Sequence, residues 1–258
     1  MAAQRLGQHF LTSHPVLQRL AEAACPAHEP LVIEIGPGRG ELTRFLVERA
    51  DRVVAIEIDS ALAARLRLGF PGVEVIEADV LATGLGQWGP AVVAGNLPYY
   101  ISSPILKRIF AMGELLRRAV VLAQLEVAER LTARPGTRDY GFLTVETNLY
   151  TQPELLFRVP PGAFSPPPKV DSAAVRLTPR ATGAWGIEDR AGFLEFAGRC
   201  FRQKRKTLRN NLLPFYGRQV EVWPEAGLRA EQLPLEKLAE LHARVRETDS
   251  GQPIADSR

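Results

Sequence analysis

Short apolar runs alternate with amphipathic stretches over the first two thirds of the chain. Apolar runs bounded by turn residues predict buried strands, and apolar residues spaced three and four apart predict helices. The predicted strands span residues 31–35, 52–58, 73–78, 91–95 and 119–123, and the predicted helices span residues 41–50, 61–68, 104–112, 126–131 and 142–149. This alternation predicts a mostly parallel sheet that is covered by helices on both faces.

Two later predicted strands, 154–159 and 173–178, have only a proline-rich loop between them. We expect them to form an antiparallel pair at one edge of the sheet. After a stretch rich in Gly, Ala and Thr at residues 179–187, the pattern becomes helical, with helices expected over 190–201, 207–213 and 235–246. The sequence therefore predicts an α/β domain over residues 1–180 and a small all-helical domain over residues 181–258.

Composition narrows the class of protein. Hydrophobic residues make up 46% of the 258 residues, and 32 basic against 29 acidic residues give a net charge of only +3. That balance argues against a chain that coats nucleic acid over its whole surface, but it permits a local basic patch. Cys25 and Cys200 form no CxxC motif or Cys/His cluster, so we expect reduced thiols and no metal site. Without a membrane-length apolar stretch or a signal-peptide pattern, we expect a cytoplasmic protein that does not contact membranes.

A glycine-rich turn follows the first predicted strand. Gly36, Gly38 and Gly40 alternate there, which lets a ligand approach the backbone closely, and the following helix would add N–H donors. The spacing is not the GxGxxG of dinucleotide-binding folds. Glu34, just before the turn, would repel a phosphate and attract a cationic amino-acid group. A tight turn without a ligand is the alternative interpretation.

Acidic residues end the next two predicted strands. Glu57 follows the first glycine by about 20 residues, a spacing that suits a carboxylate bound to the two hydroxyls of a ribose. Asp79 stands at the same relative place after the next strand and could accept a hydrogen bond from an adenine amine. With Glu34 and the glycines, these positions resemble the Rossmann-like S-adenosylmethionine methyltransferases.

The fourth predicted strand ends in Asn96-Leu97-Pro98-Tyr99. The amine of adenine is a poor nucleophile because its lone pair is delocalised into the ring, so it must pyramidalise before it can attack a methyl group. The Asn96 side-chain oxygen and the Leu97 carbonyl could accept its two hydrogens, while Pro98 fixes the backbone. The Tyr99 ring offers a surface for an extruded base. Without a ligand, the tetrapeptide would be an Asn-Pro turn at a strand end.

Over almost its whole length, the chain resembles the ribosomal RNA small-subunit adenine dimethyltransferase family (the KsgA/RsmA type). The resemblance is carried by Glu57, Asp79 and the segments at residues 7–11, 34–40, 96–102, 124–130, 140–141, 164–175 and 201–212. It implies a Rossmann-like fold whose N-terminal segment closes over S-adenosyl-L-methionine.

The resemblance also assigns roles to individual residues. It implies that His9 and Leu11 lie beside the methionine moiety, and it assigns to the same ligand Gly36, Glu57, Asp79 and Asn96. It further implies that Phe164 faces Tyr99 across the target base, although the segment alone would equally suit a core residue in a rigid loop.

Three residues depart from the family pattern. His9 stands where Asn is commoner, Tyr100 replaces the usual Asn, and Leu125 stands where a basic residue is common. The first two adjoin catalytic positions but leave the tetrapeptide intact. The third removes one charge near a helix expected to face RNA.

The densest positive stretch lies at a predicted helix junction and contains Arg202, Lys204, Arg205, Lys206 and Arg209. Basic residues with polar neighbours suit contacts to RNA phosphates, which fix position and carry little sequence information. A solvated helix face is the alternative.

We therefore predict an enzyme that uses S-adenosyl-L-methionine to dimethylate the N6 amines of two adjacent adenines. The family implies the substrate, the 3′-terminal hairpin of 16S rRNA in an assembling 30S subunit, whereas the residues imply only adenine-amine methylation. The alternatives are a 23S rRNA methyltransferase of the macrolide-resistance type, a non-catalytic assembly factor and a glutamine methyltransferase. We expect a monomer that does not act on DNA.

Overall fold

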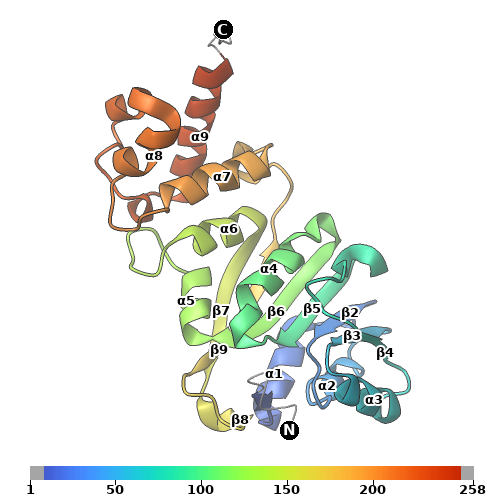
Figure 1. Cartoon of the computed structure of the whole chain (residues 1–258). Helices are drawn as coiled ribbons and strands as arrows, with labels where there is room; N and C mark the ends of the chain where they lie inside the picture. Colours follow the sequence, from blue (N-terminus) through green and yellow to red (C-terminus); the bar gives the residue numbers. More distant parts are fainter. Residues whose placement is uncertain (1–8, 251–258) are drawn as a thin grey trace. The chain divides into compact units, whose positions relative to one another are not determined.

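The computed structural model describes residues 9–250, so Gly7 and Gln8 of the N-terminal motif lie outside the described residues. The chain forms two compact units (Figure 1). The first contains the residues up to Thr132 together with Tyr150–Arg180, and the second contains Ala133–Leu149 together with the residues from Ala181 onward. The sequence analysis placed residues 133–149 in the first domain, whereas in the structure they pack with the helical unit.

The first unit is built on a sheet of seven strands, as far as residues 9–250 show, in the order β4-β3-β2-β5-β6-β9-β7 (Figure 1). Its strands are β2 (Val32–Ile35), β3 (Val53–Glu57), β4 (Glu74–Glu77), β5 (Ala91–Asn96), β6 (Leu116–Gln124), β7 (Thr151–Val159) and β9 (Ser172–Pro179). The first five strands pair in parallel, which confirms the predicted Rossmann-like sheet. Every residue of β2 and β3 is buried, as expected for parallel strands with both faces covered.

The last two strands form the predicted antiparallel pair at the edge of the sheet. β9 runs antiparallel to both β6 and β7, so β9 is the strand whose direction is reversed and β7 is the edge strand. The chain reaches β9 from β7 through a loop that contains a short strand, β8 (Phe164–Ser165). This loop lies beside residues 10–11, because β8 pairs antiparallel with β1 (Phe10–Leu11).

The helices of the first unit are α1 (His14–Ala24), α2 (Thr43–Leu46), α3 (Ser60–Gly69), α4 (Ser102–Phe110) and α5 (Leu125–Leu131). The sequence analysis missed α1, which buries Leu17, Leu20 and Ala21 on one face. It also made the helix at 41–50 too long. Phe45 and Arg49 donate to the carbonyls three residues before them, so tight turns replace most of the predicted α-helix.

The second unit is helical, with α6 (Phe142–Tyr150) at the boundary between the units, followed by α7 (Arg190–Cys200), α8 (Leu208–Tyr216) and α9 (Leu235–Ser250). Phe193 and Phe196 on α7 are almost fully buried, and both rings contact His242 on α9, at centroid distances of 5.7 and 5.6 Å. Burial lowers the pKa of His242, so the neutral imidazole is favoured among the aromatic rings. This cluster holds α7 and α9 together.

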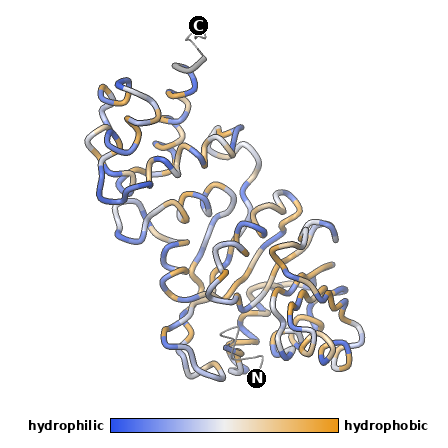
Figure 2. Tube along the Cα trace, in the orientation of Figure 1, coloured by the Kyte–Doolittle hydropathy of each residue, from blue (hydrophilic) through white to orange (hydrophobic). Residues whose placement is uncertain are grey.

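Polar stretches separate these apolar elements, and the junction between α7 and α8 is strongly hydrophilic (Figure 2). Cys25 and Cys200 are buried free thiols, and burial raises the pKa of both. None of the helices within residues 9–250 combines the length and the apolar character that crossing a membrane would require.

Candidate active site

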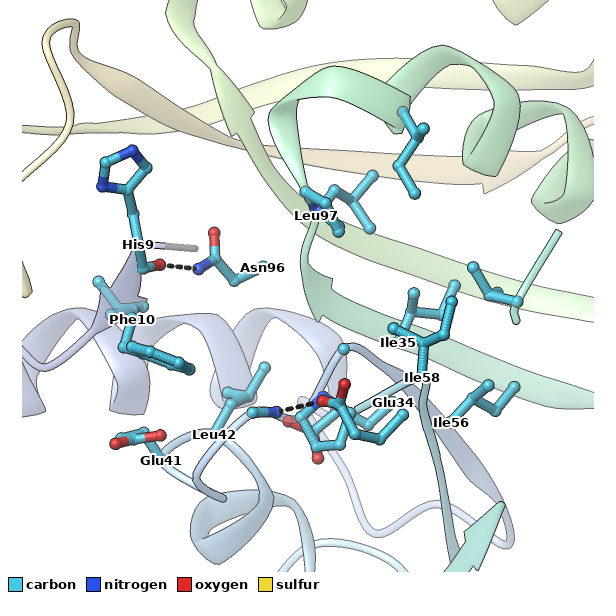
Figure 3. Close-up of a pocket in the computed structure, with 18 of the residues that line it drawn as sticks. His9, Phe10, Glu34, Ile35, Glu41, Leu42, Ile56, Ile58, Asn96 and Leu97 are labelled. Atoms are coloured by element: carbon cyan, nitrogen blue, oxygen red, sulfur yellow. Dashed lines mark hydrogen bonds between the residues drawn. The ribbon is translucent and has the colours of Figure 1, made fainter. Parts of the chain in front are cut away.

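A cavity lies at the carboxyl ends of β2, β3 and β5, where the N-terminal segment crosses the loops that follow these strands (Figure 3). Its lining includes every residue that the sequence analysis assigned to the cofactor: His9, Leu11, Glu34, Gly36, Gly38, Glu57, Asp79 and Asn96. Leu97, Pro98 and Tyr99 line the same cavity. Successive strand ends of a parallel sheet meet at one edge, which explains why residues so far apart in sequence converge here.

Gly38, in the glycine turn, contacts two other segments around the cavity, the end of β3 and the N-terminal segment. Its φ of +61° favours glycine, and its N–H donates to Glu57 Oε2 at 3.0 Å. A Cβ atom at this position would lie 3.0 Å from the Phe10 ring, so the N-terminal segment packs directly on the glycine turn. Phe10 also lies under the Arg39 guanidinium, 4.3 Å from the ring centroid. The sequence analysis gave Phe10 no role, because its only signal was its place in the N-terminal motif.

Glu57 is 4% exposed and is held by two backbone donors, Gly38 and Asp59. Burial raises the pKa of its carboxyl group, and these two hydrogen bonds act in the opposite direction. Asp79 is exposed, and its Oδ1 accepts from the Leu81 N–H at 2.8 Å. Both carboxyl groups are therefore oriented by the backbone before any ligand binds, which favours recognition of ligand hydroxyl or amine donors.

Glu34 differs from these two acids because its hydrogen bond comes from a side chain rather than from backbone N–H groups. It is 1% exposed and accepts a hydrogen bond from Thr43 Oγ1 at 2.6 Å. Burial raises the pKa of Glu34 to about 8, although the hydrogen bond from Thr43 acts to lower it. A cationic group brought into the cavity would stabilise the ionised carboxylate.

Asn96 has one satisfied and one unsatisfied side-chain atom. Its Nδ2 donates to the His9 carbonyl at 2.9 Å (Figure 3), which fixes the orientation of the amide. Its Oδ1 is buried and has no hydrogen-bond partner among residues 9–250. An orphaned buried acceptor costs about 1–3 kcal/mol. A ligand that donates a hydrogen bond to this oxygen would recover that free energy, so the site fits an amine.

The rest of the tetrapeptide forms a rigid turn. The Leu97 N–H donates to the Leu122 carbonyl at 3.0 Å, and the Leu97 side chain is 1% exposed. Pro98 has a φ of −58°, and its carbonyl accepts from Ser102 Oγ at 3.1 Å. Hydrogen bonds at the Leu97 N–H and at the Pro98 carbonyl therefore fix the backbone on both sides of the Leu97 carbonyl.

The ring of Tyr99 is fixed at both its hydroxyl group and its face. Its hydroxyl shares a 2.6 Å hydrogen bond with Ser172 Oγ at the start of β9, and its ring stacks on the His9 imidazole at a centroid distance of 5.7 Å. Burial raises the pKa of Tyr99, which keeps the phenol neutral. Ser172 belongs to the proline-rich motif, but nothing in the sequence connected it with Tyr99, 73 residues away.

Phe164 does not line the cavity in the described structure. It is 4% exposed, belongs to a core cluster with Leu11 and Leu17, and pairs with Leu11 across the β1–β8 ribbon. Its role opposite Tyr99 stays a prediction that the resemblance implied. The Thr12 N–H donates to the Ala163 carbonyl at 2.8 Å, so the Phe164 loop and the N-terminal segment form one layer beside the cavity.

The predicted RNA-binding residues lie on the second unit, where Arg202, Lys204, Arg205, Lys206 and Arg209 are all exposed. The first four occupy the turn between α7 and α8. Lys204 differs from its neighbours because its Nζ lies 4.0 Å from Glu231 Oε2 and also donates to the Arg138 carbonyl. Asn211 is 3% exposed and bonds the backbone of Cys200 and Gln203, which fixes the basic turn on α8.

The sequence profile described as "Ribosomal RNA adenine dimethylase" matches residues 2–243. Proteins named "Ribosomal RNA small subunit methyltransferase A" are 42% identical in Koribacter versatilis, over 94% of both chains, and 44% identical in Acidobacterium capsulatum, over 92% of this chain and 89% of the relative.

Two solved structures share the fold over more than nine tenths of the chain. A dimethyladenosine transferase from Plasmodium falciparum has a TM-score of 0.79 and 26% identity, covering 93% of this chain and 98% of that one. The 23S rRNA methyltransferase ErmE has a TM-score of 0.70 and 31% identity, covering 92% and 99%. With the profile match and the sequence relatives, these similarities show that the chain belongs to the ribosomal RNA adenine dimethylase family.

Proposed function

We propose that this protein transfers methyl groups from S-adenosyl-L-methionine to the N6 amines of two adjacent adenines in the 3′-terminal hairpin of 16S rRNA. Each amine would receive two methyl groups, in an assembling small subunit in the cytoplasm, and the protein would act as a monomer. The observation that carries the proposal is the buried Asn96 Oδ1, an acceptor without a partner among residues 9–250, in the cavity where the cofactor residues converge.

The cavity residues suit the three parts of this cofactor. Glu57 would bind the ribose hydroxyls, and Asp79 would accept from the adenine amine. Glu34 and the glycine turn would receive the cationic amino-acid end, whose charge favours the ionised form of Glu34. When bound, the cofactor supplies a methyl group on a sulfonium, which is already electrophilic.

The tetrapeptide would position the target amine. Asn96 Oδ1 and the Leu97 carbonyl accept its two hydrogens, which favours the pyramidal nitrogen that can attack the methyl group. The Tyr99 ring provides a stacking surface for the extruded base. No strong general base is needed, so this chain's contribution is positioning and exclusion of water.

The basic turn of the second unit would hold the RNA through its phosphates. Arg202, Arg205, Lys206 and Arg209 are exposed, and the turn is fixed by Asn211. Contacts of this kind supply affinity and orientation without reading sequence. The choice of adenine would therefore depend on the cavity.

The rival function is methylation of 23S rRNA, because ErmE shares the fold at 31% identity. The higher identity of the two small-subunit relatives, 42% and 44%, favours the small subunit. Leu97 favours it too, since enzymes of the macrolide-resistance type tend to carry Ile at this position.

The test is to incubate the purified protein with labelled S-adenosylmethionine and, in separate reactions, unmethylated small subunits, large subunits and DNA. We expect dimethylated adenine in the small subunits alone. Label in large-subunit RNA would reverse the choice of substrate, and a protein that labels no RNA would behave as a non-catalytic assembly factor.

A further inference from the structure

An exposed aromatic ring lies beside the basic turn of the second unit. Phe215, near the end of α8, is 41% exposed. A single exposed apolar side chain is common on protein surfaces and needs no function by itself. Phe215 differs because two guanidinium groups lie over its ring, that of Arg199 at 4.7 Å and that of Arg202 at 5.6 Å from the centroid. The ring is therefore exposed within a positively charged surface.

Helix geometry explains why Phe215 lies against the basic turn. Residues four apart share one face of an α-helix, and Phe215 follows Asn211 by four residues on α8. The Asn211 side chain donates to the carbonyl of Cys200, at the end of α7, and to the carbonyl of Gln203, in the turn itself. The face of α8 that fixes the basic turn therefore also carries the Phe215 ring.

The two arginines beside the ring are held to different degrees. Arg199, on α7, donates to the Tyr216 hydroxyl at 2.8 Å and forms an ion pair with Glu195. Arg202 is exposed, and within residues 9–250 its guanidinium group has no hydrogen-bond or ion-pair partner. Its distance from the Phe215 ring is close to the limit of about 6 Å for a cation–π contact. Arg199 is therefore a fixed support for the ring, whereas Arg202 is available to bind a phosphate.

We infer that Phe215 is a stacking platform for an unpaired nucleotide of the bound RNA, with a phosphate of that nucleotide on Arg202. The inference rests on the proposed function, in which the basic turn binds RNA. Every base has a flat aromatic face, so stacking on a protein ring accepts any base. In a duplex, the faces of each base are already stacked on the neighbouring base pairs. A protein ring therefore reaches only a nucleotide in a loop, a bulge or a single strand.

The platform gives the basic turn a preference that phosphate contacts lack. Contacts to phosphates hold duplex and single-stranded RNA alike, whereas stacking selects RNA that offers an unpaired base. A protein of the assembling subunit could also use an exposed phenylalanine as an apolar anchor. The charge around Phe215 favours RNA, because its two guanidinium neighbours attract phosphates and also stack on bases.

The test compares a short single-stranded RNA with the blunt duplex that it forms with its complement. Binding of each RNA to the full chain is measured by fluorescence anisotropy at one salt concentration. We expect Phe215→Ala to weaken binding of the single strand about tenfold and to leave binding of the duplex unchanged. Phe215→Trp should bind the single strand as the wild type does. Phe215→Leu, which keeps an apolar side chain without a ring, should behave as Phe215→Ala does.

The salt dependence of binding separates stacking from charge. In Phe215→Ala, the slope of the logarithm of the binding constant against the logarithm of salt concentration should equal that of the wild type, because no phosphate contact is lost. In Arg202→Gln, the slope for the single strand should fall by about 0.7, the value for one phosphate. The matched control is Val222→Ala, which removes another exposed apolar side chain of the second unit and should bind both RNAs as the wild type does.

Steady-state kinetics on unmethylated small subunits give a further readout. Phe215→Ala should raise the KM for small subunits several-fold, while kcat and the affinity for S-adenosylmethionine stay the same, because the ring lies on the second unit and does not line the cavity. Thermal melting identifies any variant that fails to fold, and Phe215→Leu keeps the comparison available if Phe215→Ala is one of them.

Three results would overturn the inference. The first is wild-type binding of the single strand by both Phe215→Ala and Phe215→Leu, and the second is an equal loss for single strand and duplex. The third is weakened binding of small subunits with unchanged binding of purified RNA, which would assign Phe215 to a protein partner. If the wild-type protein methylates no adenine in small subunits, the proposed function fails, while the comparison of single strand with duplex still decides the role of Phe215.

Discussion

The cavity at the strand ends and the basic turn are built by opposite physical means. In the cavity, two polar side chains are held by hydrogen bonds to the backbone: Glu57 by Gly38 and Asp59, and Asn96 by the His9 carbonyl. In the basic turn, Asn211 fixes the backbone, and the side chains of Arg205 and Lys206 are exposed. The proposed roles fit this difference, because orienting one amine needs buried, fixed contacts, whereas following RNA phosphates needs exposed charge.

The largest expected effect belongs to Asn96, in the cavity. We expect Asn96→Ala to lower kcat at least a hundredfold, because a preorganised group that stabilises a transition state contributes a factor of about 10²–10³. Binding of RNA should be unchanged, since the basic turn is intact. Single-turnover transfer and a filter-binding assay measure the two effects.

A matched control for this variant is Asn148→Ala, whose side chain donates to the Thr144 carbonyl within α6. It should keep wild-type transfer. Full activity in Asn96→Ala would refute the role of its side-chain oxygen as an acceptor.

A second variant, Glu57→Gln, should weaken S-adenosylmethionine binding by roughly 10- to 100-fold, because hydrogen bonds to a charged group contribute about 1.5–3 kcal/mol. The amide keeps one acceptor for the Gly38 or Asp59 N–H, so the fold should survive. Titration calorimetry measures the affinity, with Glu129→Gln as a control because that carboxylate pairs with Arg158 on the surface. Equal cofactor affinities in the two variants would exclude Glu57 from the ribose site.

For the basic turn, the expected effect is on the salt dependence of RNA binding. In a triple variant, Gln replaces Lys204, Arg205 and Lys206. The slope of the logarithm of the RNA-binding constant against the logarithm of salt concentration should then fall by about 0.7–0.9 for each phosphate that is no longer bound. Cofactor affinity should stay the same. Among the single variants, Lys204→Gln should change the slope least, because Lys204 is already paired with Glu231. An unchanged slope in the triple variant would remove the phosphate-binding role.

The last prediction concerns stability rather than binding or transfer, and it belongs to Glu34. Its pKa is about 8 in the folded protein and 4.5 in the reference state, so above pH 4.5 the folded protein retains a proton that the unfolded chain has released. The stability this group provides is therefore complete below pH 4.5 and is lost as pH rises toward 8, by roughly 1.4 kcal/mol per pH unit.

Thermal melts between pH 5 and 8 test whether the pKa of Glu34 is raised to about 8 in the folded protein. Glu34→Gln keeps an acceptor for Thr43 and should remove this part of the pH dependence, with a Tm above that of the wild type near pH 8. Parallel curves for the two proteins would show that Glu34 is ionised in the folded state. The same variant should bind the cofactor less tightly, since the amide carries no negative charge.

Most of the first unit followed from local patterns. The strand ends carried Glu57, Asp79 and Asn96 to one edge because parallel strands leave no other arrangement, and a glycine turn after β2 needed only its spacing to be recognised. What could not be predicted were contacts between distant segments. The bond between His9 and Pro166 joins positions 157 residues apart, and no periodicity encodes it.

The same reason applies to Phe164, whose ring lies in the core, while its place opposite Tyr99 stays a prediction. A two-residue ribbon such as β1–β8 is too short to leave an alternating pattern, and only tertiary packing decides which side of it faces the cavity. Helix α1 was missed although its buried residues have helical spacing. The boundary at residue 133 was missed because the helical pattern of α6 does not indicate whether the helix packs on the sheet or with the other helices.

The pairing of β1 with β8 has a consequence for the timing of synthesis. Residues 9–11 are translated before Phe164 and Ser165, which complete their ribbon and follow more than 150 residues later. Until then the His9 carbonyl has no fixed place from which to orient Asn96. We therefore expect a nascent chain that already carries the glycine turn, Glu57 and the tetrapeptide to lack methyltransferase activity until β8 has paired with β1.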